Sequence, residues 1–323
     1  MKTIRVGVIG TGHLGRYHAL NYAQIPEAEL IGVADLDPAR AGRVARESRS
    51  RAFQTLTELL SEVDAVSVAV PTDAHFDVVR TVFESGKHGL VEKPVTRTVP
   101  EADELIRLAG EKRRVFQVGH IERFNPALSG LDRTRIHPRF IEAHRLAPFN
   151  PRGTEVAVIL DLMIHDIDVV LSLVQAPVAS VDASGVAVVS DSVDIANARI
   201  RFENGAVANL TASRISQKKM RKMRLFQKDA YISVDFDGKF SEIYQLESGA
   251  AEADMVLGEI GTGDRKKRIL YRKTEAPDTN ALRTELEAFL AAVRGDPSGG
   301  VTGREGREAL VVAQAILEKI GAG

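Results

Sequence analysis

A glycine motif set between a strand-like run and a helix-like run constrains this chain more than any other feature of its sequence. The short apolar run IRVGVI begins at Ile4 and leads directly into six residues with the spacing G-x-G-x-x-G: Gly10, Thr11, Gly12, His13, Leu14 and Gly15. Glycines at this spacing allow a tight turn, a close approach of the backbone to a ligand, and close packing of helix against strand. The motif therefore predicts the first strand–turn–helix unit of a doubly wound sheet, with a simple tight turn as the alternative interpretation.

Short apolar runs alternate with helical patterns from Ile4 to His120. The later runs are ELIGVAD, AVSVAV, GLVEKP and VFQVGH, and helix-like segments separate them. Strands that alternate with helices form a parallel sheet covered on both faces. We therefore predict an α/β protein whose residues 1–121 form a doubly wound Rossmann domain.

The second half of the chain has a different pattern. A helix is expected near residues 156–174, and long alternating segments follow it: DIANARIRF, AVANLTASRI, RLFQKDAYISVDF, KFSEIYQL and KRILYRKTE. Asn204-Gly205 separates the first two segments, and Asn-Gly between alternating runs indicates a hairpin. Two amphipathic helices, TNALRTELEAFLAAVRG and GREALVVAQAILEKIG, end the chain. Residues 122–323 are therefore predicted to form a second, α+β domain built on an open, mainly antiparallel sheet.

Asp35 supports the binding of a dinucleotide at the glycine motif. It ends the second predicted strand, about 20 residues beyond the motif, where a carboxylate accepts hydrogen bonds from the adenosine ribose. Asp35 and Asp37 would repel a 2′-phosphate, so the sequence favours NAD over NADP. Arg40, on the next helix, is the residue that could reach over to a 2′-phosphate.

Two further segments lie at the carboxyl ends of predicted strands, where doubly wound folds bind their ligands. Pro71, Thr72 and His75 follow the fourth strand, and Glu92-Lys93-Pro94 ends the fifth. We expect Pro71, Thr72, His75, Glu92 and Lys93 to contact the dinucleotide, although His75 is equally well explained as the start of a helix. Lys93 should point toward the nicotinamide, where a positive charge stabilises a developing alkoxide.

The segment ILDLMIHDIDVVLSLV carries acidic and histidine side chains on an otherwise apolar helix. Asp161, His165 and Asp168 have the spacing i, i+4 and i+7, which places them on one stripe, whereas Asp166 lies about 100° away. His165 is our candidate for the proton acceptor because the unperturbed pKa of histidine is near neutrality, and Asp161 can orient its ring. Two alternatives remain open: a polar contact between domains, and a metal site, for which the sequence offers no complete ligand set.

Composition excludes several classes of function. The 43 basic and 44 acidic side chains give a net charge of −1, so no overall field favours nucleic acid or an anionic membrane. The chain has no cysteine, which excludes disulfides, thiolate metal sites and a thiol nucleophile. The opening MKTIRVGVIG has no signal-peptide pattern, and no apolar run is long enough to span a membrane, so we expect a cytoplasmic protein.

The glycine motif with Asp35, the Glu92-Lys93-Pro94 segment and the Asp161/His165 pair together resemble the Gfo/Idh/MocA oxidoreductase family. The resemblance covers essentially the whole chain. It implies that Lys93, Asp161 and His165 form the catalytic group and that NAD is the cofactor. It also implies that the open sheet of the second domain builds a homodimer or homotetramer.

The segments VGHIERFNPAL and GVIGTGHLGRYHALNYAQIPEAELIGVADLD are similar to family members that oxidise the 3-hydroxyl of UDP-N-acetylglucosamine. This resemblance implies a UDP-sugar substrate and a partner aminotransferase that makes a diamino sugar for lipid A. The substrate-binding residues that we expect are His120, Glu122, Arg123, Phe124, Asn125, Arg145 and His165. Arginines suit diphosphate oxygens, and the basic run Lys218–Lys222 is a further candidate, with a solvated strand edge as its alternative.

Two other functions fit the sequence less specifically. A dehydrogenase of a free sugar or a polyol such as inositol would be active without a UDP group. A catalytically idle NAD-sensing regulator would use the Rossmann domain alone, and the presence of Lys93, Asp161 and His165 together argues against it.

Overall fold

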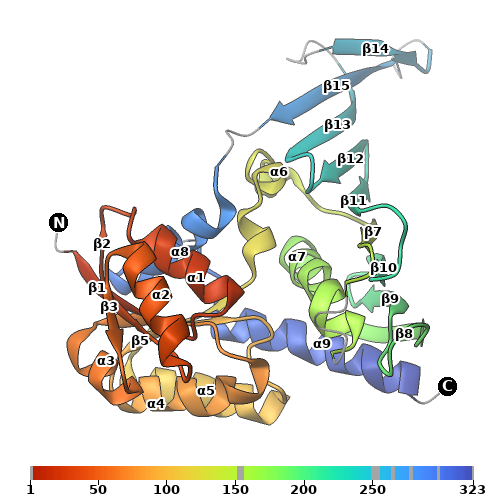
Figure 1. The fold of residues 1–323 in the computed structure, drawn as a ribbon. Helices are drawn as coiled ribbons and strands as arrows, with labels where there is room; N and C mark the ends of the chain where they lie inside the picture. Colours follow the sequence, from red (N-terminus) through yellow and green to blue (C-terminus); the bar gives the residue numbers. More distant parts are fainter. Residues whose placement is uncertain are drawn as a thin grey trace. The chain divides into compact units, whose positions relative to one another are not determined.

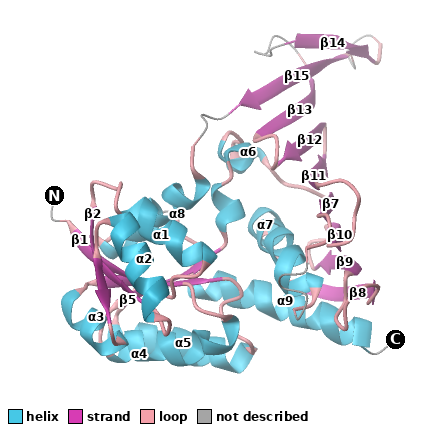
Figure 2. Cartoon of the chain, in the orientation of Figure 1, coloured by secondary structure: helices cyan, strands magenta, loops and turns pink. Residues whose placement is uncertain are grey.

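The computed structural model describes residues 3–150, 156–248, 255–262, 266–275, 279–296 and 299–321. The chain divides into two compact units, whose elements are shown in Figures 1 and 2. The first unit comprises Met1–Ile121 and Asn280–Val311, and the second comprises Glu122–Thr279 and Val312–Gly323. The units differ from the sequence-based division in one respect, because residues 280–311, expected within the domain 122–323, belong to the first unit.

The first unit contains a six-stranded sheet in the order β3-β2-β1-β4-β5-β6. All of its strand pairs are parallel, as the alternation of strands and helices predicts. The strands are β1 Ile4–Ile9, β2 Ala28–Ala34, β3 Arg51–Phe53, β4 Ala65–Val68, β5 His88–Glu92 and β6 Phe116–Gly119. Their carboxyl ends carry the glycine motif, Asp35 and Lys93.

Helices cover both faces of this parallel sheet. They are α1 His13–Tyr22, α2 Pro38–Ser48, α3 Leu56–Glu62, α4 His75–Glu84, α5 Val99–Lys112 and α8 Ala281–Val293, with α9 Gly303–Gly321 shared between the units. On one face, side chains of α1, α2 and α8 share a core with β1. On the other face, Leu59 of α3 packs against Gly7 and Phe83 of α4 packs against Gly89.

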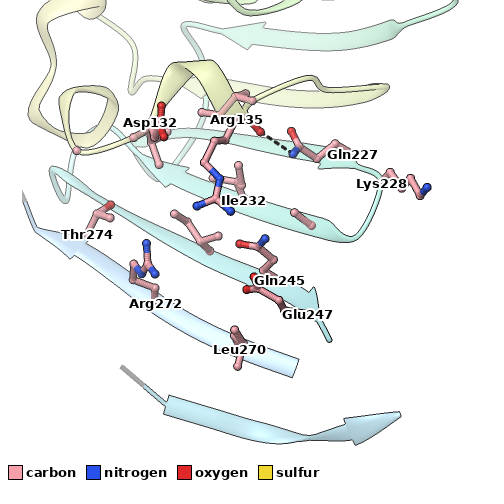
Figure 3. A pocket seen from close by; sticks show the side chains of 15 residues that line it. Asp132, Arg135, Gln227, Lys228, Ile232, Gln245, Glu247, Leu270, Arg272 and Thr274 are labelled. Atoms are coloured by element: carbon pink, nitrogen blue, oxygen red, sulfur yellow. Dashed lines mark hydrogen bonds between the residues drawn. The ribbon is translucent and has the colours of Figure 1, made fainter. Parts of the chain in front are cut away.

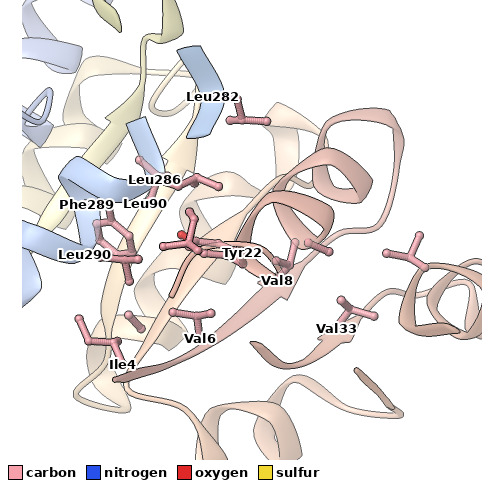
Figure 4. Close-up of a cluster of buried hydrophobic side chains, with 14 of the residues drawn as sticks. Ile4, Val6, Val8, Tyr22, Val33, Leu90, Leu282, Leu286, Phe289 and Leu290 are labelled. Carbon is pink, nitrogen blue, oxygen red and sulfur yellow. The ribbon is translucent and has the colours of Figure 1, made fainter. Parts of the chain in front are cut away.

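The helix α8 belongs to the first unit because its apolar face completes that unit's core. Leu286, Phe289 and Leu290 are fully buried against Tyr22 and its neighbours (Figure 4). Burying three large apolar side chains stabilises by about 1.5–3 kcal/mol each. Sequence order alone assigns α8 to the second domain, because helical periodicity predicts an apolar face but not the surface that covers it.

The second unit is built on a nine-stranded sheet in the order β14-β15-β13-β12-β11-β7-β10-β9-β8. Every pair is antiparallel except β7 with β10, so the expected mainly antiparallel sheet is confirmed. The strands are β7 Phe140–Leu146, β8 Val178–Val186, β9 Ile195–Phe202, β10 Val207–Ser213, β11 Met220–Gln227, β12 Ala230–Asp235, β13 Phe240–Glu247, β14 Met255–Ile260 and β15 Lys267–Glu275.

Two hairpins of this sheet differ in how clearly the sequence signals their turns. The predicted turn at Asn204-Gly205 joins β9 to β10, and Gly205 has a φ of 81°. The segment RLFQKDAYISVDF was expected as one strand, but it folds back at Lys228-Asp229 to form β11 and β12. Asp229 adopts the left-handed conformation there, with a φ of 60°. Aspartate tolerates this conformation but signals it far less strongly than Asn-Gly.

Short helices position the polar residues of the second unit. They are η2 Ile121–Phe124, α6 Pro126–Ser129, η3 Arg133–Arg135, η4 Ile159–Met163 and α7 Ile164–Val174. Buried side chains of α7, including Ile164, Ile167 and Val170, lie on the face of the sheet formed by β7 and β10. No helix in the described ranges is both long enough and apolar enough to cross a membrane.

Candidate active site

The three motif glycines meet very different surroundings. A Cβ atom on Gly10 would lie 2.6 Å from the carbonyl oxygen of Ala69, and one on Gly15 would lie 1.8 Å from the carbonyl oxygen of Gly10. A Cβ atom on Gly12 would meet nothing within 4 Å. Gly10 and Gly15 are therefore required by the fold, whereas Gly12 borders open space at the start of α1.

That open space suits a phosphate group. Gly12 is the N-cap residue of α1, and no side chain caps this helix end. Backbone N–H groups at a helix N-terminus attract anions. His13 and Leu14, both exposed, begin the helix at the same place, so the whole predicted motif lies at one helix start and fits the pyrophosphate of a dinucleotide.

Asp35 lies beside the glycine turn and is held there by hydrogen bonds. The backbone N–H and the hydroxyl of Thr11 donate to Asp35 Oδ2 at 2.6 and 2.8 Å, and the N–H of Asp37 donates to Oδ1 at 2.9 Å. Burial raises the pKa of Asp35, but these donors and nearby Arg40 hold it below its usual value. The ionised carboxylate keeps acceptor capacity for ribose hydroxyls, and Arg40 lies 3.9 Å from it.

His75 lies at a helix start, as one of its two interpretations predicts, and its contact with a cofactor stays a prediction. It is the first residue of α4 and only 1 % exposed. Its Nδ1 lies 2.8 Å from the carbonyl oxygen of Pro94 and its Nε2 lies 3.0 Å from that of Val70. Burial lowers its pKa against the effect of these hydrogen bonds. His75 therefore joins the ends of β4 and β5, and the helix-start interpretation is the one that the structure supports.

The other predicted residues of this edge lie where parallel strands end. Pro71 and Thr72 form the loop and the start of η1 (Thr72–Ala74) after β4. Glu92 is the last residue of β5, and Lys93, which follows it, is partly exposed. His120 follows β6 and is buried. The first unit thus brings the glycine turn, Asp35 and Lys93 to one edge of its sheet, as predicted.

In the second unit, Asp161 and His165 lie on either side of a change in helix type. Asp161 belongs to η4, a π-helical turn, and His165 is the second residue of α7. The sequence predicted one regular α-helix, and a π-turn interrupts the expected stripe by adding a residue to the turn. Such turns are rare and frequently occur at functional sites. Both side chains are partly exposed, whereas Asp166 and Asp168 are buried.

Arg145 does not occupy the diphosphate-binding position that the sequence suggested. It is 2 % exposed, and its Nε and Nη2 donate to the two oxygens of Asp166 at 2.9 and 2.8 Å. Its Nη1 donates to Glu122 at 2.7 Å. Burial lowers the pKa of Arg145, but the two carboxylates outweigh burial and raise the pKa far above its usual value. Arg145 and Glu122 therefore anchor α7 to the sheet.

Two more of the predicted substrate contacts serve the same anchoring network. Arg123 donates to both oxygens of Asp168 at 2.7 and 2.9 Å. The side chain of Asn125 caps α6 and donates to Glu122 at 2.9 Å and to the carbonyl oxygen of Phe236 at 3.2 Å. Phe124, at the end of η2, is partly exposed. Arg123 and Arg145, which the sequence assigned to an anionic ligand, are thus both held in ion pairs within the second unit.

The basic run Lys218–Lys222 also has acidic partners. Lys219 lies 2.7 Å from Asp237, and Lys222 lies 3.0 Å from Asp235. β11, which contains Lys222, lies between β7 and β12. The strand-edge interpretation of this run is therefore wrong for the residues within β11, because they belong to an inner strand.

A cavity of about 510 Å³ lies on the sheet of the second unit, apart from these residues (Figure 3). Arg135, Gln227 and Arg272 are among the side chains that line it. None of the predicted catalytic or substrate-binding residues lines this cavity. It therefore adds nothing to the candidate site.

The sequence interpretation missed one buried residue at the site, His18 of α1. Its Nε2 lies 2.9 Å from Glu92 Oε1, and its side chain is 1 % exposed. The available signal was positional, because His18 shares the buried face of α1 with Gly15 and Tyr22 at helical spacing. A histidine on such a face needs a polar partner, and Glu92 is that partner.

Comparison with known proteins gives matches over nearly the whole chain. Residues 4–120 match the GFO/IDH/MocA oxidoreductase family with its NAD-binding Rossmann fold, and residues 138–233 match the C-terminal domain of that family. UDP-N-acetylglucosamine 3-dehydrogenase of Acidithiobacillus ferrooxidans is 43 % identical over 98 % of this chain and 97 % of its own. Inositol 2-dehydrogenase of Rhizobium meliloti is 24 % identical over 98 % and 97 %.

Solved structures give the same result. The Acidithiobacillus ferrooxidans enzyme superposes with a TM-score of 0.88 at 41 % identity, covering 100 % of this chain and 99 % of the other. A levoglucosan dehydrogenase in complex with NADH and levoglucosan has a TM-score of 0.85 at 19 % identity, covering 99 % and 98 %. The second likeness establishes the fold alone.

Proposed function

We propose, from the premise that this chain belongs to the GFO/IDH/MocA family of oxidoreductases, that it oxidises the 3-hydroxyl of UDP-N-acetylglucosamine to a ketone. The chain is an NAD-dependent sugar dehydrogenase acting on a CH–OH group, and the proposal concerns its substrate. The observation that carries the proposal is the full-length similarity to an enzyme of that name. The keto sugar would pass to an aminotransferase, which would form a diamino sugar for lipid A.

The first unit would hold the cofactor through residues already in place. NAD, when bound, supplies the two-electron oxidant of the reaction. The backbone at Gly12 would approach the pyrophosphate, and the carboxylate of Asp35 would accept hydrogen bonds from the ribose hydroxyls. The charge of Asp35 disfavours a 2′-phosphate, and Arg40 is directed toward Asp35 and Asp37.

Three side chains would carry the proton chemistry. The imidazole of His165 would take the proton of the sugar hydroxyl, because histidine is the side chain best suited to accept a proton near neutral pH. The ammonium of Lys93 would stabilise the alkoxide that develops as the proton leaves. Asp161 would orient the imidazole. His120 and Phe124 remain our proposed contacts for the sugar nucleotide.

A free polyol is the second candidate substrate. Inositol 2-dehydrogenases are similar to this chain along its whole length, though at lower identity. The anchoring of Arg123 and Arg145 by carboxylates also removes two cations that a diphosphate would use. Activity on free inositol, without a nucleotide, would support this candidate.

We further propose that the chain forms a homodimer or homotetramer through the sheet of its second unit. Five aromatic rings form a continuous row across five strands, with neighbouring centroids 5.1–5.7 Å apart: Phe140, Phe226, Tyr231, Tyr244 and Tyr271. They alternate with core residues such as Leu225 and Ile232, so they lie on the face opposite the core. All five side chains are partly exposed, and such an aromatic row on a sheet face favours association with a second copy.

The substrate is tested by mixing the protein and NAD with UDP-N-acetylglucosamine, free N-acetylglucosamine or myo-inositol. We expect NADH to form with the UDP-sugar and not with the free compounds. A ketone trap or an aminotransferase should be present, so that removal of the ketone draws the reaction forward if its equilibrium is unfavourable. NMR of the product locates the ketone, and NADH formation from inositol alone would reject the proposed substrate.

The catalytic roles are tested by Lys93→Met and His165→Gln, with Lys112→Met on the exposed end of α5 as the control. We expect each catalytic variant to lose about 10²–10⁴-fold in kcat. NAD affinity, measured by calorimetry, should change little. Near-normal turnover of either variant would remove that residue from the mechanism.

A further inference from the structure

The cavity on the sheet of the second unit is a pocket that the proposed function does not use. Its volume of about 510 Å³ lies within the range of about 300–1,000 Å³ that is usual for small-molecule sites. Every residue that lines it belongs to the second unit. The cavity lies on the sheet face that carries Ile232, whereas Tyr231 of the aromatic row is on the opposite face (Figure 3). A second copy packed on the aromatic row would therefore leave the cavity open.

The segment that walls the cavity is tied to the sheet at both ends. Residues 127–137, which we call the covering segment, run from α6 through η3. At one end, the hydroxyl of Ser241 in β13 donates to the carbonyl oxygen of Ala127 at 2.6 Å. At the other end, the amide of Gln227 donates to the carbonyl oxygen of Arg135 at 2.9 Å and accepts from the N–H two residues further on at 2.8 Å. The cavity is therefore shaped by contacts within the chain and needs no ligand to form it.

The floor of the cavity is apolar. Ile232, Ile243 and Leu270 come from the three neighbouring strands β12, β13 and β15. Ile232 and Leu270 are buried, and Ile243 between them is partly exposed. A ligand with an apolar body would gain about 25 cal/mol for each Å² of apolar surface that it removes from water here.

Cations from two different walls also line the cavity. Arg135 comes from η3, Arg272 comes from β15, and both side chains are exposed (Figure 3). The guanidinium group of Arg135 makes no hydrogen bond with any residue that the structure describes. Lys228, in the turn after β11, is the third cation of the lining. Arg135 thus has its N–H donors available for an oxygen anion.

The lining holds two acids, and each already has a neighbour. The carboxylate of Asp132 accepts from the backbone N–H and the hydroxyl of Thr134 at 3.0 and 2.6 Å. Glu247 lies directly opposite Arg268 in the register of β13 with β15. Three cations against two acids give the lining an excess of positive charge, which favours an anionic ligand.

We infer that this cavity binds a small organic anion with an apolar body, of the kind represented by a medium-chain carboxylate. Its carboxylate would accept hydrogen bonds from Arg135 and Arg272, because arginine forks suit carboxylate oxygens. Its hydrocarbon part would cover Ile243. An inorganic anion lacks the apolar part and a neutral amide of the same chain lacks the charge, so both should bind more weakly.

The test uses the full chain and the fluorescent dye anilinonaphthalene sulfonate, an aromatic anion that becomes brighter in an apolar site. Saturating NAD is present throughout, so that the dinucleotide site of the first unit is filled. We expect the dye to bind with a stoichiometry of about one per chain. Octanoate should displace it, whereas octanamide and inorganic phosphate at equal concentration should not.

Three variants and a control locate the site. Arg135→Met and Arg272→Met each remove one guanidinium group and should weaken octanoate binding by about tenfold or more, as expected for the loss of a charge-assisted hydrogen bond. Gln245→Trp fills the cavity from its floor, leaves both arginines in place, and should abolish octanoate binding. Arg201→Met is the control, because Arg201 is an exposed residue of β9 that does not line the cavity, and it should bind octanoate like the wild type.

Hydrogen exchange of the wild-type protein gives a second measurement that needs no variant. Octanoate should slow exchange in peptides of the covering segment and of β13, and it should leave peptides of β1 and β4 unchanged. Unchanged affinity in Arg135→Met and Gln245→Trp would place the anion elsewhere and overturn the inference. Equal displacement by octanamide would also overturn it, because charge would then play no part. Dye binding per chain that falls as the protein concentration rises would show that a second copy covers the cavity, and this too would overturn the inference.

Discussion

Replacing Arg145 with methionine should destabilise the second unit strongly, because the change strands two buried carboxylates. Arg145 is 2 % exposed and makes three hydrogen bonds of 2.7–2.9 Å with Glu122 and Asp166. Both acids are themselves buried. Methionine fills much of the same volume, so the loss would come from charge and hydrogen bonding and not from an empty cavity.

The size of the expected loss in unfolding free energy follows from the burial of Arg145, Glu122 and Asp166. Removing one partner of a buried ion pair costs about 3–5 kcal/mol, because the remaining charge is uncompensated. That is a large part of the roughly 5–15 kcal/mol that stabilises an average domain. Lys219→Met is the control, since Lys219 lies 2.7 Å from Asp237 in an ion pair that is largely open to solvent. Exposed pairs contribute about 0–1 kcal/mol.

Urea unfolding followed by pulsed hydrogen exchange and mass spectrometry measures each unit separately. Peptides of β7 and α7 report on the second unit, and peptides of β1 and β4 report on the first. We expect Arg145→Met to lower the midpoint only for the second unit. The triple variant that adds Glu122→Gln and Asp166→Asn should recover much of the loss, because it removes the stranded charges.

Two results would refute this reasoning. A loss of less than about 1 kcal/mol in Arg145→Met would mean that water or rearrangement compensates the carboxylates. A triple variant no more stable than the single variant would mean that the packing of Arg145, and not its charge, supports the unit.

Three further perturbations test separate parts of the structure. Gly12→Ala should keep the melting temperature but weaken NAD binding by about tenfold or more, whereas Gly15→Ala should impair folding, and calorimetry with thermal unfolding distinguishes them. Asp194→Asn should lower unfolding free energy by about 1–3 kcal/mol at neutral pH. Hydrogen bonds outweigh burial and lower the pKa of Asp194 in the folded protein. The Asp194 carboxylate therefore stabilises the fold at pH values above its pKa in the unfolded chain, and this stabilisation is lost as the pH falls through its folded-state pKa. The difference in unfolding free energy between variant and wild type should vanish over the same pH range. Tyr244→Lys should shift light-scattering mass toward the monomer, and an unchanged mass would exclude the aromatic row as the interface.

The parallel sheet could be predicted because its signals are local. Each strand is a short apolar run, each helix has its own periodicity, and Gly10 and Asp35 mark the two ends of the first βαβ unit. The carboxyl edge then follows from geometry, since parallel strands all end on the same side. Lys93 could be placed at that edge from the sequence alone for this reason.

The features that could not be predicted depend on contacts between distant segments. The amphipathic pattern of α8 would suit either unit. The packing of Leu286 and Phe289 against Tyr22 is what assigns α8 to the first unit. The π-turn at Asp161 is likewise not marked in the sequence, since the same residues have a regular helical pattern. Helical periodicity predicts that one face of a helix is buried, but it does not indicate which surface that face packs against.

The polar residues near the predicted site show why residue type alone misleads. An arginine next to a functional motif is equally suited to bind a phosphate or a buried carboxylate, and the side chain has the same fork in both cases. Arg145 and Arg123 each meet an aspartate of α7 through two hydrogen bonds. Whether these arginines bind a phosphate or a carboxylate depends on where Asp166 and Asp168 lie. The sequence predicts that both aspartates are on a helix, but it does not show what that helix faces.

These two arginines explain how α7 can present His165 in a defined direction. Asp166 and Asp168 are two residues apart and so point about 200° apart around the helix axis. Apolar packing alone tolerates rotation of a helix, because the hydrophobic effect has no direction. Directional pairs on two sides of α7 fix its rotation, and with it the direction of His165. The cations that the sequence suggested for substrate therefore hold the helix that carries the proposed base.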